Sequence, residues 1–336
     1  MSYLLKPLQT GSLTLANRLI MPPMATAKSE ADGSINKAVL DYYQEKSNGG
    51  GFSLIIIEHS FISQQGKASN NQLSVADDSV LAGLRSLADV IHRNGSKTMM
   101  QINHAGSATT QEITGMAPIA PSTVPHPRNG NTPKELTKQE IIEIIHAFQT
   151  AASRVKTAGF DGIEIDSAHG YLLNQFFSPL TNKRTDEYGG TIHNRIRLHL
   201  QIIEAVRAAV GDNFPILLRL GACDFQEGGI TLEDSQIAAK EFEKAGISIL
   251  DISGSLLGYN SPESADQGYF SPLTEAIKQA VSIPIILTGG ITEPQAAEEL
   301  LASGKADLIG VGRAVLKNSL WAKHAIESLE TATYCR

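Results

Sequence analysis

The chain is poor in the residues that mark several protein classes. Its 336 residues contain two cysteines, Cys223 and Cys335, whose separation matches no metal-ligand spacing. This excludes a cysteine-ligated iron–sulfur cluster within this chain and indicates a reducing compartment. No apolar run approaches the roughly 18 residues of a membrane helix, and the N-terminus lacks the charged and apolar regions of a signal peptide. The sequence therefore predicts a soluble, cytoplasmic protein that does not enter a membrane.

An excess of positive charge is also missing. Lysine and arginine number 28 against 35 acidic residues, the formal net charge is −7, and the basic residues are scattered. We therefore expect no nucleic-acid partner and no anionic membrane surface. The length fits a single α/β barrel domain that spans residues 1–336. We expect a small-molecule substrate, and the composition leaves a homo-oligomer open.

One pattern repeats along the chain, in which a short apolar run precedes a stretch of helical periodicity. Thr137 and Glu140 form a capping box before one helix, and glycines end several others. This alternation predicts a (β/α)8 TIM barrel, with the hairpin-like residues 4–17 closing its floor. An open, doubly wound sheet is the alternative, but its Gly-x-Gly-x-x-Gly turn is absent. The eight predicted strands are Arg18–Met24, Phe52–Ser60, Lys97–His104, Gly162–Asp166, Pro215–Gly221, Ile247–Ser253, Ile283–Gly289 and Ala306–Gly312.

Polar residues gather where the predicted strands end. Asp166, His169 and Tyr171 follow the fourth strand, and the segment from Asp161 to Arg195 has the composition of an active-site loop. Chemistry in TIM barrels is carried at the carboxyl ends of the strands, so we expect these three side chains to share one mouth. A histidine or tyrosine taken alone is as readily a packing residue.

Two glycine turns and an arginine follow the last two strands. Gly289-Gly290 comes after the seventh strand and Gly312-Arg313 after the eighth. Loops at these places form the usual phosphate site of the fold, with backbone N–H groups and a guanidinium as donors. A glycine pair by itself is equally a helix-entry turn. The combination predicts a bound phosphate.

Arg219 and Gln101 interrupt strands that should otherwise be apolar. A buried guanidinium is costly unless an anion or a strong acceptor meets it, and an ion pair with a barrel carboxylate such as Glu164 is the alternative. Gln101 offers a donor and an acceptor to the edge of a heteroaromatic ring. Together with the phosphate site, the two residues indicate a phosphorylated ring cofactor, without specifying which one.

Several segments resemble one known family in order along the chain. They are LLKPLQTGSLTLANRLIMPPM, QINHAG, HGYLLNQFFSPLTNKRTDEYGGTIHNR and LIGVGRA, between residues 4 and 313. This chain resembles the Old Yellow Enzyme family, also described as the NADH:flavin oxidoreductase family. The resemblance implies a (β/α)8 barrel with one non-covalently bound FMN.

The resemblance also implies roles for individual residues. Pro23 and the backbone near Ala25 would lie against the isoalloxazine ring, Gln101 would pair with its pyrimidine edge and Arg219 would face N1 and O2. His169 would bind the substrate oxygen or the nicotinamide amide, and Tyr171 would be the proton donor. The ribityl chain and phosphate would contact Ser253, Gly290, Gly312 and Arg313. The implied activity passes hydride from NADH or NADPH through the flavin to an electron-poor acceptor, such as an activated alkene, a quinone or a flavin.

Three positions depart from the family pattern. Ala25 stands where many members have Thr or Cys, and His59 stands where small residues commonly follow the second-strand glutamate. Asp166 stands where enone reductases usually have histidine, and we place it in the catalytic group with His169 and Tyr171. Branches that oxidise amines or reduce dienoyl thioesters also depart there, but they carry a cluster-binding cysteine set and an added domain that these 336 residues do not show.

Two other functions stay open. In a non-catalytic FMN-binding barrel, Asp166 and His59 would mark a lost substrate site. A metal-dependent barrel hydrolase could use histidines and aspartates at the strand ends, but the first strand has no metal ligand. We predict no metal site. The sequence does not decide between NADH and NADPH, and it does not name the acceptor.

Overall fold

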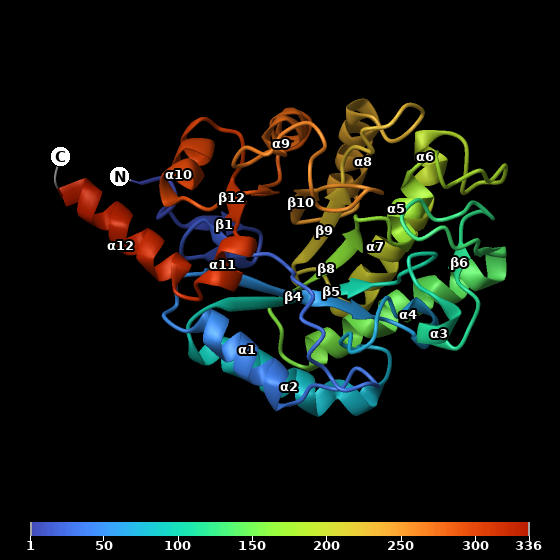
Figure 1. Ribbon diagram of the computed structural model, residues 1–336, viewed down its shortest axis with the longest axis horizontal. Coiled ribbons are helices and arrows are strands. Elements are labelled where there is room, and N and C mark those ends of the chain that lie inside the picture. Colours follow the sequence, from blue (N-terminus) through green and yellow to red (C-terminus); the bar gives the residue numbers. More distant parts are fainter. Residues whose placement is uncertain (1, 335–336) are drawn as a thin grey trace.

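Eight parallel strands close into a barrel in the computed structural model, which describes residues 2–334 and the side chains as far as residue 331. The predicted barrel is confirmed, and each predicted strand overlaps one observed strand, with β4 and β8 each ending one residue later than predicted (Figure 1). Cys335 lies outside the described residues. The strands, in their order around the barrel, are β3 (Leu19–Met21), β4 (Leu54–Phe61), β5 (Lys97–Asn103), β8 (Gly162–Ser167), β9 (Ile216–Gly221), β10 (Ile249–Ser253), β11 (Ile285–Thr288) and β12 (Leu308–Gly310).

A hairpin closes the floor of the barrel, as the sequence predicted. Strands β1 (Leu8–Thr10) and β2 (Leu13–Leu15) pair antiparallel. Their inward leucines form one apolar cluster with side chains from the lower ends of the barrel strands. This cluster contains Leu8, Leu13, Leu15, Ile20, Leu54, Ile56, Met99, Leu217, Ile249, Ile286 and Leu308. The lower half of the barrel is therefore a dry core.

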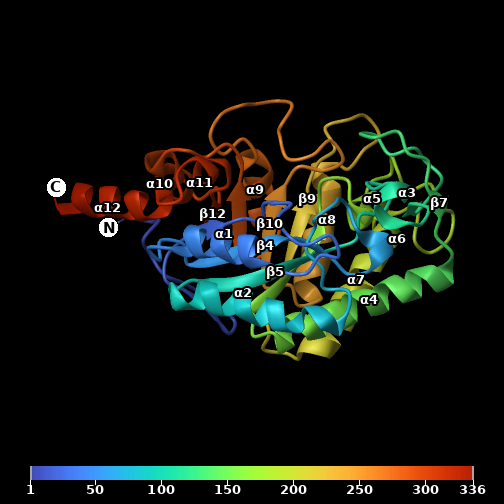
Figure 2. The same cartoon turned by 60° about the horizontal axis from the view of Figure 1, so that its bottom comes forward.

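Helices cover the outside of the barrel (Figure 2). A second and larger core fills the space between them and the outward side chains of the strands. The capping box at Thr137 and Glu140 is present at the start of α4, and Gly159 follows that helix with a left-handed φ of 90°. The principal helices are α1 (Lys37–Ser47), α2 (Leu81–Arg93), α4 (Lys138–Thr157), α7 (Arg197–Val210), α8 (Leu232–Lys244), α9 (Ser271–Lys278), α10 (Pro294–Ala302) and α12 (Trp321–Tyr334). None of the helices in this described part has the length and apolar character that a membrane crossing needs.

Polar side chains replace the apolar ones in the upper half of the barrel. Alternate residues of a strand point to the same face, so the positions two beyond the dry core also point inward. On β5, β9 and β10 these positions are Gln101, Arg219 and Asp251, each of them buried. The interior of the barrel is thus apolar in its lower half and polar just below its mouth.

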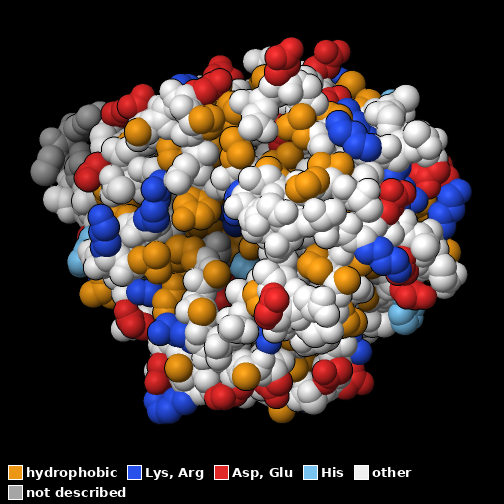
Figure 3. Space-filling view, turned by 45° about the vertical axis from the view of Figure 1, so that its right-hand side comes forward, with side chains coloured by type: hydrophobic (Ala, Val, Ile, Leu, Met, Phe, Trp, Pro, Cys, Tyr) orange, Lys and Arg blue, Asp and Glu red, His pale blue; other side chains and the backbone are white. Residues whose placement is uncertain are grey.

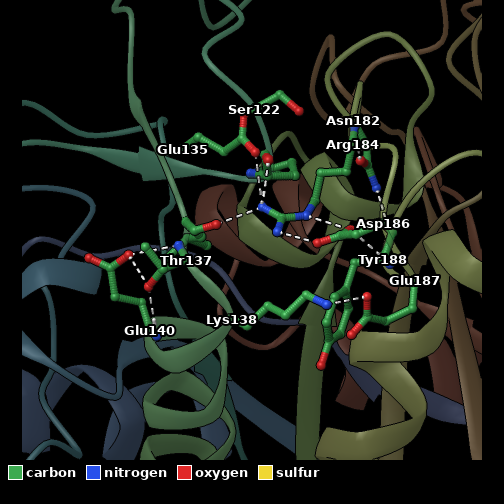
Figure 4. Close-up of polar contacts among 12 residues, drawn as sticks. Ser122, Glu135, Thr137, Lys138, Glu140, Asn182, Arg184, Asp186, Glu187 and Tyr188 are labelled. Atoms are coloured by element: carbon green, nitrogen blue, oxygen red, sulfur yellow. Dashed lines mark hydrogen bonds and ion pairs between the residues drawn. The ribbon is translucent and has the colours of Figure 1, made fainter.

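The long loop after β8 is fastened to the segment between β5 and α4 (Figure 4). That segment contains a small parallel pair, β6 (Ile119–Ala120) and β7 (Lys134–Glu135). Arg184 donates to the carbonyls of Leu136 and Pro121 at 2.6 and 3.1 Å, and it grips Asp186 through two nitrogens at 2.6 and 3.0 Å. The charged part of the predicted active-site loop therefore serves as a structural clasp, and we assign the chemistry to its first residues.

Candidate active site at the mouth of the barrel

The three predicted catalytic side chains lie at one strand end. Asp166 is on β8, His169 is in the following turn, and Tyr171 is the residue before the short helix α5 (Leu172–Phe177). His169 has a left-handed φ of 56°, and Gly170 follows with a φ of 75°. This turn reverses the chain above the barrel. Figure 3 shows the molecule with the right-hand side of Figure 1 brought forward, and a histidine is visible in a hollow of that face.

His169 is held in place from three sides. Its Nε2 lies 2.8 Å from the Ser253 hydroxyl, and its backbone N–H donates to the Gly254 carbonyl at 3.3 Å. The exposed Arg128 donates to the His169 carbonyl at 2.5 Å. Burial and the nearby positive charge of Arg219 hold the pKa of His169 well below its usual value. The imidazole is therefore neutral at physiological pH.

Asp166 is almost fully buried, with 1% of its surface exposed. One carboxyl oxygen accepts from the Ala168 N–H at 3.2 Å, and the other has no hydrogen-bond partner among the described residues. Burial raises the pKa of Asp166 to about 7, although the attraction of Arg219 opposes this shift. The raised pKa favours the neutral carboxylic acid near neutral pH, a form that can donate a hydrogen bond.

Tyr171 lies against His59, which comes from the end of β4. The Tyr171 hydroxyl is 3.5 Å from His59 Nε2, and the ring centroids are 5.2 Å apart. His59 Nδ1 is 2.6 Å from Nε2 of Gln72. Burial, followed by the negative charge of Asp166, raises the pKa of Tyr171 to about 12. His59 therefore points toward the predicted proton donor.

Arg219 is the cation of a buried cluster of carboxyl groups. Its Nε is 3.2 Å from Asp251 Oδ2, so the ion pair is made with the neighbouring strand β10, and Gln101 donates to the Glu164 carboxyl at 2.8 Å. Burial and repulsion from Asp251 raise the pKa of Glu164 well above its usual value, and burial raises the pKa of Asp251 to about 6. Arg219 Nε still lacks an aligned hydrogen bond. The guanidinium keeps donors for a further acceptor.

The predicted phosphate turns come together beside a tyrosine that sequence reasoning missed. Among the described residues, the N–H groups of Gly290 and Gly312 donate to no protein acceptor. A Cβ added to Gly290 would lie 2.9 Å from the Tyr269 ring, so the ring covers this turn closely. The Tyr269 hydroxyl accepts from Arg313 at 3.1 Å. These groups form a cradle of donors of the kind that phosphate sites use.

The segment after β3 passes alongside this cradle. Pro23 is partly buried, Ala25 is exposed, and a Cβ added to Gly312 would lie 3.2 Å from the sulfur of Met24. Thr26 is fixed to the buried Glu58 carboxyl by its N–H and its hydroxyl, at 2.7 and 2.6 Å. The segment thus offers backbone and small side chains against which a flat ring can lie.

Sequence reasoning also missed Gln72 and Arg128, which hold His59 and His169 from distant segments. Neither lies on a strand end or in a recognisable motif, so only the folded chain brings them to the mouth. Across residues 2–334, no group of three or more His, Cys, Asp or Glu side chains is arranged to hold a metal ion. The hydrolase alternative therefore has no ligand set in this part of the chain.

The fold and the site define a barrel protein suited to a phosphorylated flavin. Free N–H groups and Arg313 suit the phosphate, while Arg219 and Gln101 offer polar atoms to the ring edge. Comparison with known proteins agrees with this class. The chain belongs to the NADH:flavin oxidoreductase / NADH oxidase family, whose model matches residues 3–332. The family and the FMN cofactor expected from the sequence are thereby confirmed.

Individual relatives differ in length from this chain. It is 45% identical over 325 residues to an NADH oxidase of Thermoanaerobacter brockii. The matched region covers 94% of this chain and 50% of that protein. It is 40% identical over 309 residues to an NADPH dehydrogenase of Clostridium acetobutylicum, covering 91% of this chain and 89% of that protein. The structure of 2-naphthoyl-CoA reductase in complex with 2-naphthoyl-CoA superimposes with a TM-score of 0.92 at 29% identity, covering 97% of this chain and 52% of that one.

The chain therefore spans about half the length of the first curated relatives it matches. This finding corrects one inference from the sequence. We set aside the branches with an added domain because these 336 residues do not show it, but some similar proteins are about twice as long as the matched region. The length of this chain is no argument against such a branch.

Proposed function

We propose that this chain is an FMN-dependent oxidoreductase that takes hydride from NADH or NADPH and passes it to an electron-poor small molecule. The observation that carries the proposal is the position of Arg219. It is a buried guanidinium that Asp251 holds by an ion pair, in the same barrel mouth as Asp166, His169 and Tyr171. When bound, FMN supplies the hydride transfer; the residues of this chain supply binding, charge and protons.

Arg219 would face the part of the ring that gains negative charge on reduction. Burial opposes the charge of the guanidinium, but the ion pair with Asp251 favours the protonated form. Fixed positive charge in a dry site stabilises such an anion far more than it would in water. Gln101 would contribute its carbonyl oxygen and the second N–H of its amide to the ring edge, since one N–H is donated to Glu164.

His169 and Asp166 would grip the oxygen of the acceptor. A neutral imidazole and a protonated carboxyl group each offer a donor, and the acceptor oxygen gains charge as hydride arrives. Tyr171 would give its proton to the carbon of an activated alkene, which breaks its O–H bond and leaves the electron pair on the phenol oxygen. A quinone or a flavin as acceptor would not need this step.

The remaining assignments belong to the same proposal. Residues 1–336 would act as one FMN-binding barrel domain, and the low cysteine content supports a cytoplasmic setting. Pro23 and Ala25 would lie against the ring, while the ribityl phosphate would be held by Ser253, Gly290, Gly312 and Arg313. The related NADH oxidase and NADPH dehydrogenase leave both nicotinamides open as the donor.

The test begins with the purified chain loaded with FMN, kept free of oxygen. We expect NADH or NADPH to bleach the flavin absorbance, and an acceptor such as 2-cyclohexenone or a quinone to restore it. Tyr171→Phe should slow only the restoration by the alkene. Bound flavin that neither nicotinamide reduces would favour the non-catalytic FMN-binding alternative, and a chain that does not bind FMN would refute the proposal.

A further inference from the structure

Contacts hold the side chain of His59 in a fixed orientation, and the proposed reaction gives this residue no role. It stands at the end of β4, in a position where the family resemblance implies a small residue. Its imidazole touches Tyr171 on one side and Gln72 on the other. We infer that His59 is a positioning residue for the proton donor, and that its Nε2–H donates a hydrogen bond to the Tyr171 oxygen. The inference deepens the proposed function and rests on it.

The proton of His59 is located by the contacts of Gln72. The amide oxygen of Gln72 accepts from the Ala68 backbone N–H at 2.6 Å, so its NH2 group must face the other way. That nitrogen lies 2.6 Å from His59 Nδ1 and 3.1 Å from the His59 carbonyl oxygen. Because the amide can only donate there, Nδ1 must be the acceptor. A neutral imidazole then carries its hydrogen on Nε2, directed at Tyr171.

The imidazole is neutral for physical reasons that are independent of Gln72. Burial, together with the positive charge of Arg219, lowers the pKa of His59 to about 4. A neutral imidazole is not a proton source for a phenolate, because losing its only N–H would create an imidazolate. His59 therefore donates a hydrogen bond and keeps its proton, and water restores the proton of Tyr171 after the product leaves.

The hydrogen bond acts on the alkene step alone. When the Tyr171 O–H bond breaks and the new C–H bond forms, the phenol oxygen becomes negative. An ionised Asp166 opposes that charge and a protonated one does not, while Arg128 and Arg219 favour it. A donor from His59 stabilises the charged oxygen more than the neutral one. It also occupies a lone pair of the phenol, which leaves the hydroxyl hydrogen free to point at the acceptor.

A double-mutant cycle with His59→Ala and Tyr171→Phe tests the inference in the FMN-loaded protein. We expect His59→Ala to slow reoxidation of the reduced protein by 2-cyclohexenone about ten- to a hundredfold, the range for a lost hydrogen bond to a charged group. Reduction by the nicotinamide and reoxidation by benzoquinone should stay within about twofold, because neither needs Tyr171 as an acid. In the Tyr171→Phe background, His59→Ala should cause no further slowing.

Three outcomes would overturn the inference. His59→Ala could leave the alkene reaction unchanged, it could slow all three reactions equally, or it could slow the alkene reaction further in the Tyr171→Phe background. A second measurement does not depend on turnover. Nitrogen NMR of histidine-labelled protein should show His59 neutral with its hydrogen on Nε2, and Tyr171→Phe should shift the Nε2 resonance. A hydrogen on Nδ1 would overturn the inference even if no alkene reacts. Failure of the proposed function would appear separately, as wild-type flavin that no nicotinamide bleaches.

Discussion

At the scale of single residues, Asp166 links the pH of the solution to the state of the site. Its pKa is about 7 in the folded chain and near its ordinary value of 3.8 when unfolded. The fold therefore prefers the protonated form. The stability that this preference contributes is fully present below pH 3.8 and is lost as the pH rises through about 7.

Asp166→Asn should therefore stabilise the FMN-loaded protein at high pH and have little effect at low pH. We expect the difference in unfolding free energy from wild type to grow from near zero below about pH 3.8 to on the order of 4 kcal/mol at about pH 9, with most of the rise between the unfolded and folded pKa values. Groups that do not interact with Asp166 titrate alike in both proteins and cancel in the difference, whereas Glu164 and Asp251 interact with Asp166 and contribute to it. Urea unfolding at several pH values measures it, and a difference that does not depend on pH would show that Asp166 is not protonated.

Arg313 should contribute to binding of the FMN phosphate and not to binding of the ring. It lies among free N–H groups after β12, and Tyr269 holds its side chain. Arg313→Ala should weaken FMN binding by about ten- to a hundredfold and leave riboflavin binding unchanged. Tyr269→Phe keeps the ring over the glycine turn and removes only the hydroxyl, so its effect should be smaller. Equal losses for FMN and riboflavin, measured by flavin fluorescence, would place the phosphate elsewhere.

At the scale of elements, the clasp around Arg184 depends on two adjacent glycines in different ways. A Cβ added to Gly189 would lie 2.1 Å from the Arg184 carbonyl oxygen, whereas one added to Gly190 meets nothing within 4 Å. Gly190 has a left-handed φ of 80°, which costs a substituted residue about 1 kcal/mol.

Gly189→Ala should therefore destabilise the protein by roughly 2–4 kcal/mol, because the backbone of the clasp must move. Gly190→Ala is its matched control and should cost only about 1 kcal/mol. Thermal and urea unfolding of the two variants measure the difference. Equal and small losses would show that the loop yields without strain and that the clasp does not stabilise the fold.

At the scale of the whole molecule, the first described residues are tied to α10, far along the chain. Glu298 accepts hydrogen bonds from the Ser2 hydroxyl and from the N–H groups of Tyr3 and Leu4, at 2.6, 2.6 and 2.8 Å. Figure 1 shows the N-terminal segment beside that helix. The tie holds the entry to the floor hairpin next to the seam where β12 pairs with β3.

Glu298→Ala should lower the unfolding free energy by about 1–3 kcal/mol, because three donors lose one carboxylate. Glu299→Ala is the control on the same helix, since Glu299 is exposed and its carboxylate accepts one hydrogen bond, from the Gln295 amide, among the described residues. It should cost less than about 0.5 kcal/mol. Comparable losses in both variants would mean that helix α10 itself, and not its tie to the N-terminus, is affected.

The barrel could be read from the sequence because its signals are local. Apolar runs, the capping box at Thr137 and left-handed glycines such as Gly159 are each set by neighbouring residues and by the period of the backbone. Asp166, His169 and Tyr171 could be placed at one mouth because the ends of parallel strands meet there in this fold. The candidate site was predictable as far as it lies on strand ends.

Contacts between distant segments could not be predicted in this way. The partner of Arg219 is Asp251 because of the pairing register of β9 and β10, and Tyr269 covers Gly290 from a loop without periodicity. The direction of His59 depends on Gln72. Composition, strand order and the residue types at the mouth were thus determined by the sequence itself. Which polar groups pair, and which keep a proton, was decided only by the tertiary structure, because pairing and burial depend on atoms that folding brings together.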